Sequence, residues 1–411
     1  MSTTEQVLLS IFKSFLLNNK ENNTYAGIDW NEVLLKAELH QIQTLLYSTV
    51  SKYVTFEKAN ETKYFDNHFK KTIMLKYINN KIFYEQACLV LKELESAGVR
   101  CIALKGLYLR FIYPNPELRS MADVDILVKE SDIELAKKAL IRIGYNIVRK
   151  DYKDLQFIKD NSYPIELHHC IVEQKYIKKY AEFNKQVWDS ALEFSFGTTN
   201  ALVLAPKEMV IHLLMHMLTH MRTGGFGLRQ ISDLVLFCRK FETQLDWKRI
   251  YIDLVYYEIW PFSRMILLLC SIEFGLKIPC ELLSQNSDDE IYLKMLIKDI
   301  LSGGVFGDIS SQERFNANRL SEYANANGDN IVYKLSMLRS YLFPSREKLR
   351  YKYSYARKSI IHLIIAWFHR LAYGILHQGF NILQRFRMLT DDKILEEAKK
   401  RVNLMKMMGL K

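Results

Sequence analysis

The sequence contains few residues that interrupt regular structure, with seven prolines and sixteen glycines among 411 residues. Almost half of the residues are apolar and a quarter are charged, a composition that excludes a disordered chain. A run of about 18 uncharged apolar residues, which a membrane-spanning helix needs, is also lacking. We therefore expect a folded protein of two or three domains without a transmembrane segment.

Features of secreted and zinc-binding proteins are missing as well. Lys13 and Ser14 interrupt the apolar pattern near the N-terminus, and no small-residue cleavage site follows, so we expect no secretory signal. The cysteines form no Cys-x-x-Cys pair; they are Cys88, Cys101, Cys170, Cys238, Cys270 and Cys280. This scatter argues against a zinc ribbon or a disulfide framework and predicts a cytoplasmic protein.

Positive charge is concentrated at the C-terminal end of the chain. Residues 341–411 contain 15 Lys or Arg and 5 Asp or Glu, a balance of +10 out of the whole chain's +11. The first 340 residues are thus nearly neutral, and a nucleic-acid function cannot be inferred from the overall charge. Any basic surface belongs mainly to the tail.

Apolar periodicity predicts an α+β protein with a small mixed sheet between two helical regions. Residues 1–97 have the helical period, clearest over 65–97, and Gly98 is expected to end that helix. Short strands are expected at 99–104, 123–128, 145–148 and 164–168, with the last two paired antiparallel, and Ser131-Asp132 should cap a helix that reaches Ile143. The helical period returns over 205–223, 228–241 and 247–276, and glycines over 302–308 suggest a linker.

Two carboxylates stand at alternate positions of one predicted strand. Asp123 and Asp125 are separated by Val124 and followed by an apolar run, so both acids point to one face. Like charges held together in this way repel unless a cation neutralises them. Glu166, between apolar neighbours on a later strand, has the right context for a third carboxylate. Transfer of phosphoryl or nucleotidyl groups needs such a set, because carboxylates hold divalent ions about 4 Å apart around the reacting oxygens. A surface strand with alternating Asp remains the structural alternative.

Upstream residues suit an anion. Lys105-Gly106 lies where a strand gives way to a helix, and backbone N–H groups at such a turn can bind phosphate oxygens. Arg119 could grip the same phosphates with its planar fork or simply pair with Asp123. Lys105 likewise is either a phosphate ligand or a solvated lysine.

These motifs resemble a family. Leu104-Lys105-Gly106, the segment from Arg119 to Val128, Gly144-Tyr145 and the segment from Ile165 to His169 look like the uncharacterised bacterial nucleotidyltransferase family of the DNA polymerase β superfamily. The resemblance implies that Gly106 belongs to a phosphate-binding turn, that Asp123, Asp125 and Glu166 hold metal ions, and that His168 matches a histidine often found after the third acid. Position 107 departs from the wider superfamily, since Leu107 stands where Ser or Gly is usual.

The resemblance also implies a reaction, in which a nucleoside monophosphate passes from a nucleoside triphosphate to an acceptor with Mg²⁺ or Mn²⁺ as the cofactor. Asp123, Asp125 and Glu166 would be the catalytic and metal-binding residues, and Lys105, Gly106, Arg119 and His168 would bind the nucleotide. The acceptor stays open among a small molecule, RNA and protein. Two other functions stay open as well: an inactive nucleotide-binding scaffold, and a basic module that binds RNA or a membrane surface.

Further residues carry weaker hypotheses. His212, His216 and His220 share one helix face and could bind metal, form buried hydrogen bonds or line the cleft. Arg229 and Asp233 have the spacing of an ordinary i,i+4 ion pair. The tail over 359–389, with Tyr351, Tyr353 and Tyr355 before it, could lie on an anionic membrane, bind RNA or pack as a core helix.

We accordingly expect four regions: a helical region over 1–97, a nucleotidyltransferase core over 98–200, a helical domain over 201–300 that completes the cleft, and a basic helical region over 301–411. The last of these could place a cytoplasmic protein at the periphery of a membrane through contact with an anionic surface.

Overall fold

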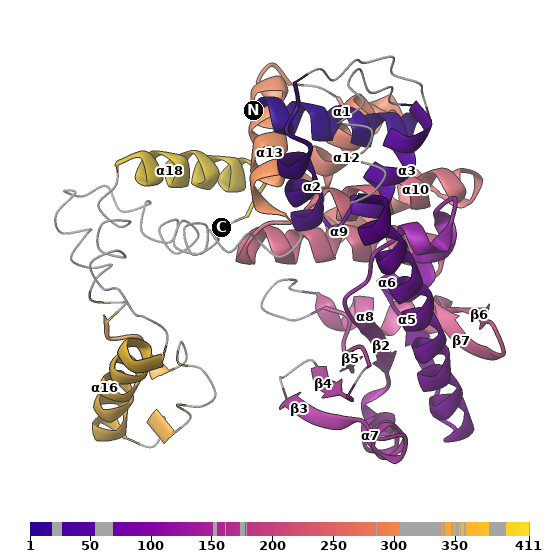
Figure 1. The fold of residues 1–411 in the computed structure, drawn as a ribbon, viewed down its shortest axis with the longest axis vertical. Helices are drawn as coiled ribbons and strands as arrows, with labels where there is room; N and C mark the ends of the chain where they lie inside the picture. Colours follow the sequence, from indigo (N-terminus) through magenta and orange to yellow (C-terminus); the bar gives the residue numbers. More distant parts are fainter. Residues whose placement is uncertain are drawn as a thin grey trace. The chain divides into compact units, whose positions relative to one another are not determined.

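The fold was analysed in a computed structural model of the chain (Figure 1). The structure describes residues 1–18, 27–53, 69–150, 154–160, 162–172, 177, 179–284, 286–304, 339, 342–346, 349, 353, 355–356, 359–377 and 392–410. Contacts divide the chain into two compact units, residues 1–308 with 408–410, and residues 309–407 with 411.

The N-terminal part is helical, as the periodicity predicts. Its helices are α1 (Thr3–Leu17), α2 (Trp30–Leu39), α3 (Gln43–Tyr53) and α5 (Lys70–Ser96). Ser2 and Glu5 form a capping box on α1, and Asp29 caps α2 by accepting hydrogen bonds from two backbone N–H groups. Gly98 ends α5 with φ +73°, a left-handed conformation that glycine adopts without strain. The helix α5 contacts α3, α7 and the sheet, so it links the helical part to the strands (Figure 1).

A seven-stranded mixed sheet forms the centre of the first unit. Its order is β3-β4-β5-β2-β1-β7-β6. The strands are β1 (Cys101–Ala103), β2 (Val124–Val128), β3 (Asn146–Lys150), β4 (Asp154–Ile158), β5 (Ile165–His168), β6 (Leu192–Phe196) and β7 (Thr199–Val203). The predicted α+β class is confirmed.

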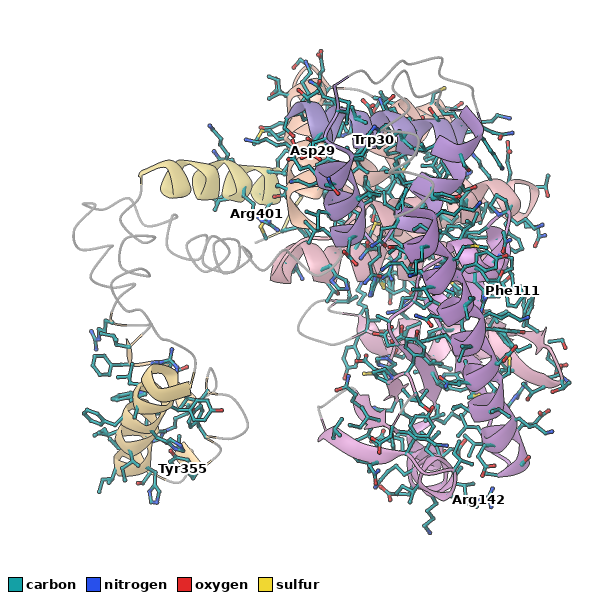
Figure 2. All side chains as sticks on the ribbon, viewed as in Figure 1. Asp29, Trp30, Phe111, Arg142, Tyr355 and Arg401 are labelled. Atoms are coloured by element: carbon teal, nitrogen blue, oxygen red, sulfur yellow. The ribbon has the colours of Figure 1, made fainter. Side chains whose placement is uncertain are left out.

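Two local predictions about the sheet and its neighbours were wrong, and one hairpin was missed. The strands near 145–148 and 164–168 do not pair with each other, because the unpredicted strand β4 lies between them and pairs antiparallel with both. The hairpin of β6 and β7 was also not predicted, and β7 joins the sheet parallel to β1. Asp132 precedes α7 (Ile133–Arg142) as expected but makes no side-chain capping bond. At the other end of α7, Arg142, labelled in Figure 2, donates a 2.6 Å hydrogen bond from Nε to Glu93 of α5.

The register of the central strands positions the predicted acids. The strand β2 pairs antiparallel with β1 and parallel with β5. Asp125 is the register partner of Glu166, and Glu166 is in turn the partner of Gln156 on β4. Opposed residues on neighbouring strands share a face, so these three side chains form a row across the sheet.

Helices follow the strands and complete the first unit. They are α6 (Lys105–Leu109) and α7, α8 (Tyr180–Ser190), α9 (Pro206–Thr223), α10 (Leu228–Lys240), α11 (Trp247–Tyr256), α12 (Trp260–Phe274) and α13 (Asp289–Gly303), with 3₁₀ turns at Arg110–Ile112, Pro116–Leu118, Glu130–Asp132, Glu242–Gln244 and Cys280–Leu282. The predicted helix over 247–276 is two helices, since the chain turns at Glu258 with φ +60° and Pro261 starts a new first turn. Most of the predicted linker at 302–308 lies outside the described residues.

The second unit contains α16 (Ile360–His377) and α18 (Asp392–Met407). Leu349, Tyr353, Ala356 and Ala366 form a small buried cluster, against which Tyr355 and Leu363 pack. Tyr355 lies beside α16 in Figure 2, and its hydroxyl is 2.9 Å from Nδ1 of His369. Tyr351 and residues 378–391 lie outside the described residues. Among the helices that the structure describes, none has the length and apolarity to cross a membrane.

Candidate active site

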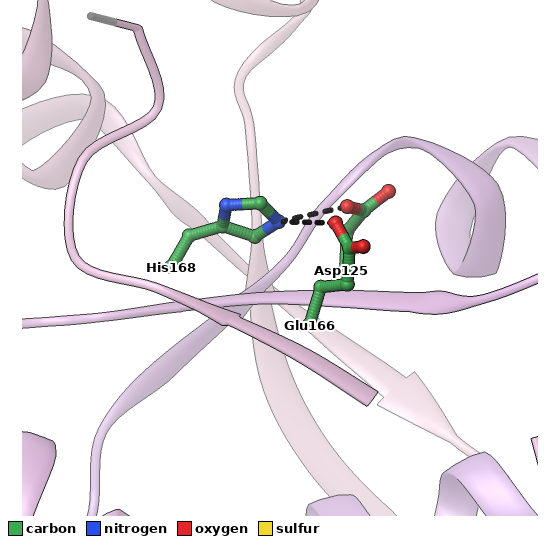
Figure 3. A group of neighbouring side chains, drawn as sticks. All are labelled: Asp125, Glu166 and His168. Carbon is green, nitrogen blue, oxygen red and sulfur yellow. Dashed lines mark hydrogen bonds and ion pairs between the residues drawn. The ribbon is translucent and has the colours of Figure 1, made fainter. Parts of the chain in front are cut away.

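The predicted acids lie at one end of the central strands, where Asp125 and Glu166 come together with His168 and Asp123 lines the same cavity. Asp125 lies on β2 and Glu166 beside it on β5, while Asp123 directly precedes β2. One donor atom each from Asp125, Glu166 and His168 lie within 4.8 Å of one another (Figure 3). His168 Nε2 is 2.8 Å from Asp125 Oδ1 and 3.7 Å from Glu166 Oε2. The donors of a carboxylate-rich metal site are thus close together, with a histidine among them.

Basic groups compensate part of the negative charge on these carboxylates. Lys105 Nζ lies 3.3 Å from the second carboxylate oxygen of Asp125. Burial opposes ionisation of Asp125, but Lys105 and the hydrogen bond from His168 outweigh it and hold the pKa of that carboxyl well below its usual range. Asp123 behaves in the opposite way: burial and the charge of Asp125 raise its pKa to about 6. The two acids of the predicted pair therefore differ in how well their charges are compensated.

The acids open into a polar cavity of about 250 Å³. Its strand side carries the carboxylates and its other side comes from α9 and α10. The lining residues are Lys105, Gly106, Arg119, Met121, Ala122, Asp123, Asp125, Glu166, His168, Leu213, His216, His220, Arg229, Gln230 and Asp233. Every residue that the family resemblance nominated as a metal or nucleotide ligand lines this one cavity.

Arg119 lies at the cavity, but its guanidinium is held by protein groups. Its Nε and Nη2 each donate to a carboxylate oxygen of Asp233 at 2.8 Å, and Nη1 donates to the carbonyl of Gly106 at 3.3 Å. Burial lowers the pKa of Arg119, but the Asp233 charge outweighs this and raises it above the usual value. Asp233 also accepts a 2.7 Å hydrogen bond from Tyr113. The expected i,i+4 pair of Arg229 with Asp233 is therefore wrong: Asp233 pairs with Arg119.

Arg229 reaches the cavity from the first turn of α10. Its Nη1 donates to the Gln41 side chain and, at 3.3 Å, to the carbonyl of Ser120. Gln41 stands between α2 and α3 with φ +54°, a conformation unusual for a side chain larger than glycine. Its neighbour His40 is fully buried and bonds the N–H of Leu228 and the carbonyl of Leu301. The N-terminal helices are thereby joined to the start of α10 beside the site.

The three histidines of α9 divide between two environments. His216 and His220 line the cavity, with their Nε2 atoms 3.0 Å apart, whereas His212 is buried. Burial, followed by the charge of Lys105, lowers the pKa of His216 well below its usual value, so this ring is neutral near pH 7. In the described part of the chain, the group suited to a metal ion contains His168 and none of these three histidines. The geometry favours the cleft-lining alternative for His216 and His220.

The chain also matches the model of a protein family. The model of a family described as an uncharacterised nucleotidyltransferase matches residues 26–275, well over half of the chain. The chain belongs to this family. No curated protein and no solved structure matches it. The matched residues include all the nominated acids, the cavity helices α9 and α10, and the Gln41 segment, so the nucleotidyltransferase family extends over both walls of the cavity.

Two features of this nucleotidyltransferase were not predicted as parts of the site. Gln41 gave no signal, because a single polar residue between two helices has no recognisable pattern. Gln156, which donates a 3.4 Å hydrogen bond to Glu166 Oε1, lies on the strand that was missed. At position 107, where the sequence departs from the superfamily pattern, the Leu107 side chain is buried in the core and does not line the cavity.

Proposed function

We propose that this protein transfers a nucleoside monophosphate from a nucleoside triphosphate to an acceptor nucleophile, by a polymerase β-like mechanism that uses Mg²⁺ or Mn²⁺. The observation that carries the proposal is the pairing of Asp125 with Glu166 on adjacent parallel strands, beside Asp123 and His168 in one polar cavity. The family match supports nucleotidyl transfer in general.

The donor set fits a hard divalent cation. Carboxylate oxygens are the ligands that such ions prefer, and Asp125 and Glu166 supply them within the distance that one ion can bridge. Asp123 adds a third carboxylate, whose pKa is raised by burial and by the charge of Asp125. When bound, the metal ions neutralise charge on the phosphates and activate the acceptor oxygen. In this proposal Asp123, Asp125 and Glu166 hold the ions.

The remaining residues bind and orient the reactants. Lys105 can turn from Asp125 toward a phosphate oxygen, since its Nζ already lies in the cavity. Lys105 also has a φ of +25°, a strained value of the kind that functional sites tolerate. The hydrogen bond from His168 orients the Asp125 carboxylate, and Gly106 brings the backbone close to the cavity. Direct phosphate binding by Arg119 remains a prediction, and its bonds to Asp233 favour a positioning role.

The chemical step balances without a further reactant. The acceptor oxygen forms a bond to the α-phosphorus, the bond from that phosphorus to the bridging oxygen breaks, and pyrophosphate leaves with the bonding electrons. The proton of the acceptor would pass to a carboxylate oxygen, a role that we assign to Glu166. The polar lining of the cavity suits charged phosphates. A small molecule, RNA and protein are all compatible acceptors.

Label transfer tests this proposal. The full chain is incubated with each α-labelled nucleoside triphosphate, Mg²⁺ or Mn²⁺ and a cell extract, and wild type is compared with Asp123→Asn. The matched control is Asp160→Asn, which changes an exposed aspartate on the turn after β4. We expect label in an acceptor with wild type and control only. Incorporation that survives Asp123→Asn would reject the site, and nucleotide binding without incorporation by wild type would favour the inactive-scaffold alternative.

A second proposal concerns the tail, which we assign to an anionic membrane surface on the cytoplasmic side. Five large apolar side chains of α16 are exposed along one stripe, namely Ile360, Ile361, Ile364, Ile365 and Phe368. Between Lys348 and Thr390 the sequence has eight Lys or Arg and no Asp or Glu. Exposed apolar residues on a cationic segment are typical of helices that lie in the headgroup layer.

Sedimentation with lipid vesicles tests the tail. We expect the full chain to bind vesicles that contain phosphatidylserine more tightly than pure phosphatidylcholine vesicles, and Ile361→Asp to weaken this binding. The control is Ile291→Asp, an equally exposed isoleucine on α13 of the first unit. Equal binding by wild type and Ile361→Asp would reject the surface, and salt-sensitive binding of RNA in place of vesicles would favour the nucleic-acid alternative.

A further inference from the structure

Two arginines line the cavity, and their guanidinium groups are bonded very differently. In Arg119 the edge formed by Nε and Nη2 is occupied by the carboxylate of Asp233, with both distances 2.8 Å. In Arg229 the nitrogen that bonds described residues is Nη1, which donates to Gln41 and to the Ser120 carbonyl. Nε and Nη2 of Arg229 make no hydrogen bond to any described residue, and Nε is also buried. The edge that binds a carboxylate in one arginine is thus unfilled in the other.

The guanidinium of Arg229 also lacks an ion pair with any described carboxylate, since Asp233 is taken by Arg119. Burial and the nearby charge of Arg119 both disfavour its protonated form and lower its pKa. An arginine nevertheless stays protonated in proteins, so a half-buried guanidinium whose Nε is shielded from water and has no bonded anion carries a free-energy cost. A bound anion would remove that cost.

The two bonds that Arg229 does make hold it in position. Gln41 and the Ser120 carbonyl both accept from Nη1, which leaves the opposite edge directed away from them. Arg229 lies on the helical side of the cavity and interacts electrostatically with Asp123 on the strand side. A group that spans the cavity between the acids and Arg229 would carry negative charge at the Arg229 end and coordinate metal at the other end. A metal-bound polyphosphate has both properties.

We propose that Arg229, positioned by Gln41, binds the phosphate chain of the nucleotide. This inference rests on the proposed function, because it names the residue that receives the phosphates of that same substrate. Its planar fork offers two parallel N–H donors, the arrangement that phosphate oxygens accept best. The two arginines then have different roles: Arg229 binds the ligand, and Arg119 fixes the position of α10 through Asp233.

Calorimetric titration of the full chain tests the assignment. The probes are inorganic tripolyphosphate and ATP, each with Mg²⁺, and the variants are Arg229→Gln, Arg229→Lys and Gln41→Ala. Arg249→Gln, at an exposed arginine on α11, is the control. We expect Arg229→Gln to weaken tripolyphosphate binding about tenfold or more, the usual effect of losing a charge-assisted hydrogen bond. Arg229→Lys should bind more weakly than wild type, since it keeps the charge and loses the fork.

Thermal unfolding without ligand separates ligand binding from a structural role. If Arg229 serves the ligand, Arg229→Gln should change the unfolding temperature little, because the loss of a half-buried charge that has no ion-pair partner offsets the loss of the two hydrogen bonds from Nη1. Unchanged affinity in Arg229→Gln, when wild type binds, would overturn this inference alone. Failure of wild type to bind either probe would overturn the proposed function as well. If both Arg229 variants fail to fold, Arg229 is a structural residue and the inference is also overturned.

Discussion

The two walls of the cavity carry opposite charge and are built from different kinds of structure. The strand wall, from β2 and β5, presents three carboxylates, with Asp125 and Glu166 side by side. The helical wall, from α9 and α10, presents two histidines and Arg229, while Asp233 is neutralised by Arg119. The buried pair of Arg119 and Asp233 fixes the helical wall, whereas Asp123 and Arg229 form no ion pair with any described residue. Metal ions suit one wall and phosphates suit the other.

The strand wall should respond most strongly to the loss of its central charge. Asp125→Asn removes the carboxylate that contacts both Lys105 and His168. We expect nucleotide transfer to fall at least about a thousandfold, which corresponds to about 4 kcal/mol of transition-state stabilisation. Label transfer measures the activity, and titration with Mn²⁺ measures the metal affinity. A variant that still binds Mn²⁺ as wild type does would show that Asp125 is not a ligand.

The pair between Arg119 and Asp233 should matter to stability more than any unpaired group of the helical wall. Both side chains are about 4% exposed, so Asp233→Ala leaves a buried guanidinium without its anion. We expect a loss of about 3 kcal/mol in the free energy of unfolding, the lower end of the range for a broken buried pair, because Arg119 keeps the Gly106 carbonyl. Urea unfolding measures this change in free energy. If Asp233→Ala loses no more free energy of unfolding than Arg229→Gln does, the structural role of Arg119 would not differ from that of Arg229.

The strand wall could be predicted from the sequence because its information is local. Alternation around Asp123 and Asp125 fixes the face of both acids, and the short motif at Glu166 identifies its strand. A buried strand with a polar face has a period that few other structures share. The N-terminal helices and the helices of the cavity were predicted for the same reason, since their apolar periods are long and regular.

The contacts that position the helical wall could not be predicted, because they connect distant residues. Arg119 and Asp233 are 114 residues apart, and Arg229 and Gln41 are 188 residues apart. Local spacing instead favoured the wrong pair of Arg229 with Asp233. The missed strand β6 is mostly exposed, so no buried face marks it in the sequence. The four predicted regions and the residue roles remain predictions.

Gln41 tests whether the N-terminal helices contribute to the helical wall. Gln41→Ala removes the side-chain acceptor of Arg229 Nη1 and leaves the Ser120 carbonyl. We expect tripolyphosphate affinity to fall about fivefold, close to the 1 kcal/mol of one hydrogen bond. The variant should keep its Mn²⁺ affinity, which belongs to the strand wall. Equal losses of phosphate and metal affinity would indicate a general change of the cavity and would contradict a separate role for each wall.

Gly106 accepts a hydrogen bond from Arg119, which pairs with Asp233 of the helical wall. Its substitution should have the smallest effect on stability. A Cβ at this position would lie 3.1 Å from Arg119 Nη1 and 3.3 Å from Met121 Cε, so both side chains must shift by a few tenths of an ångström. Alanine in a helix is favoured over glycine by about 0.5–1 kcal/mol, which offsets this crowding. We expect Gly106→Ala to change the free energy of unfolding by less than about 0.5 kcal/mol, since the two effects oppose each other. Phosphate affinity should still fall, because the added methyl group narrows the cavity where Arg119 contacts the Gly106 carbonyl. Unchanged affinity with unchanged stability would show that this approach of backbone to cavity has no part in binding the ligand.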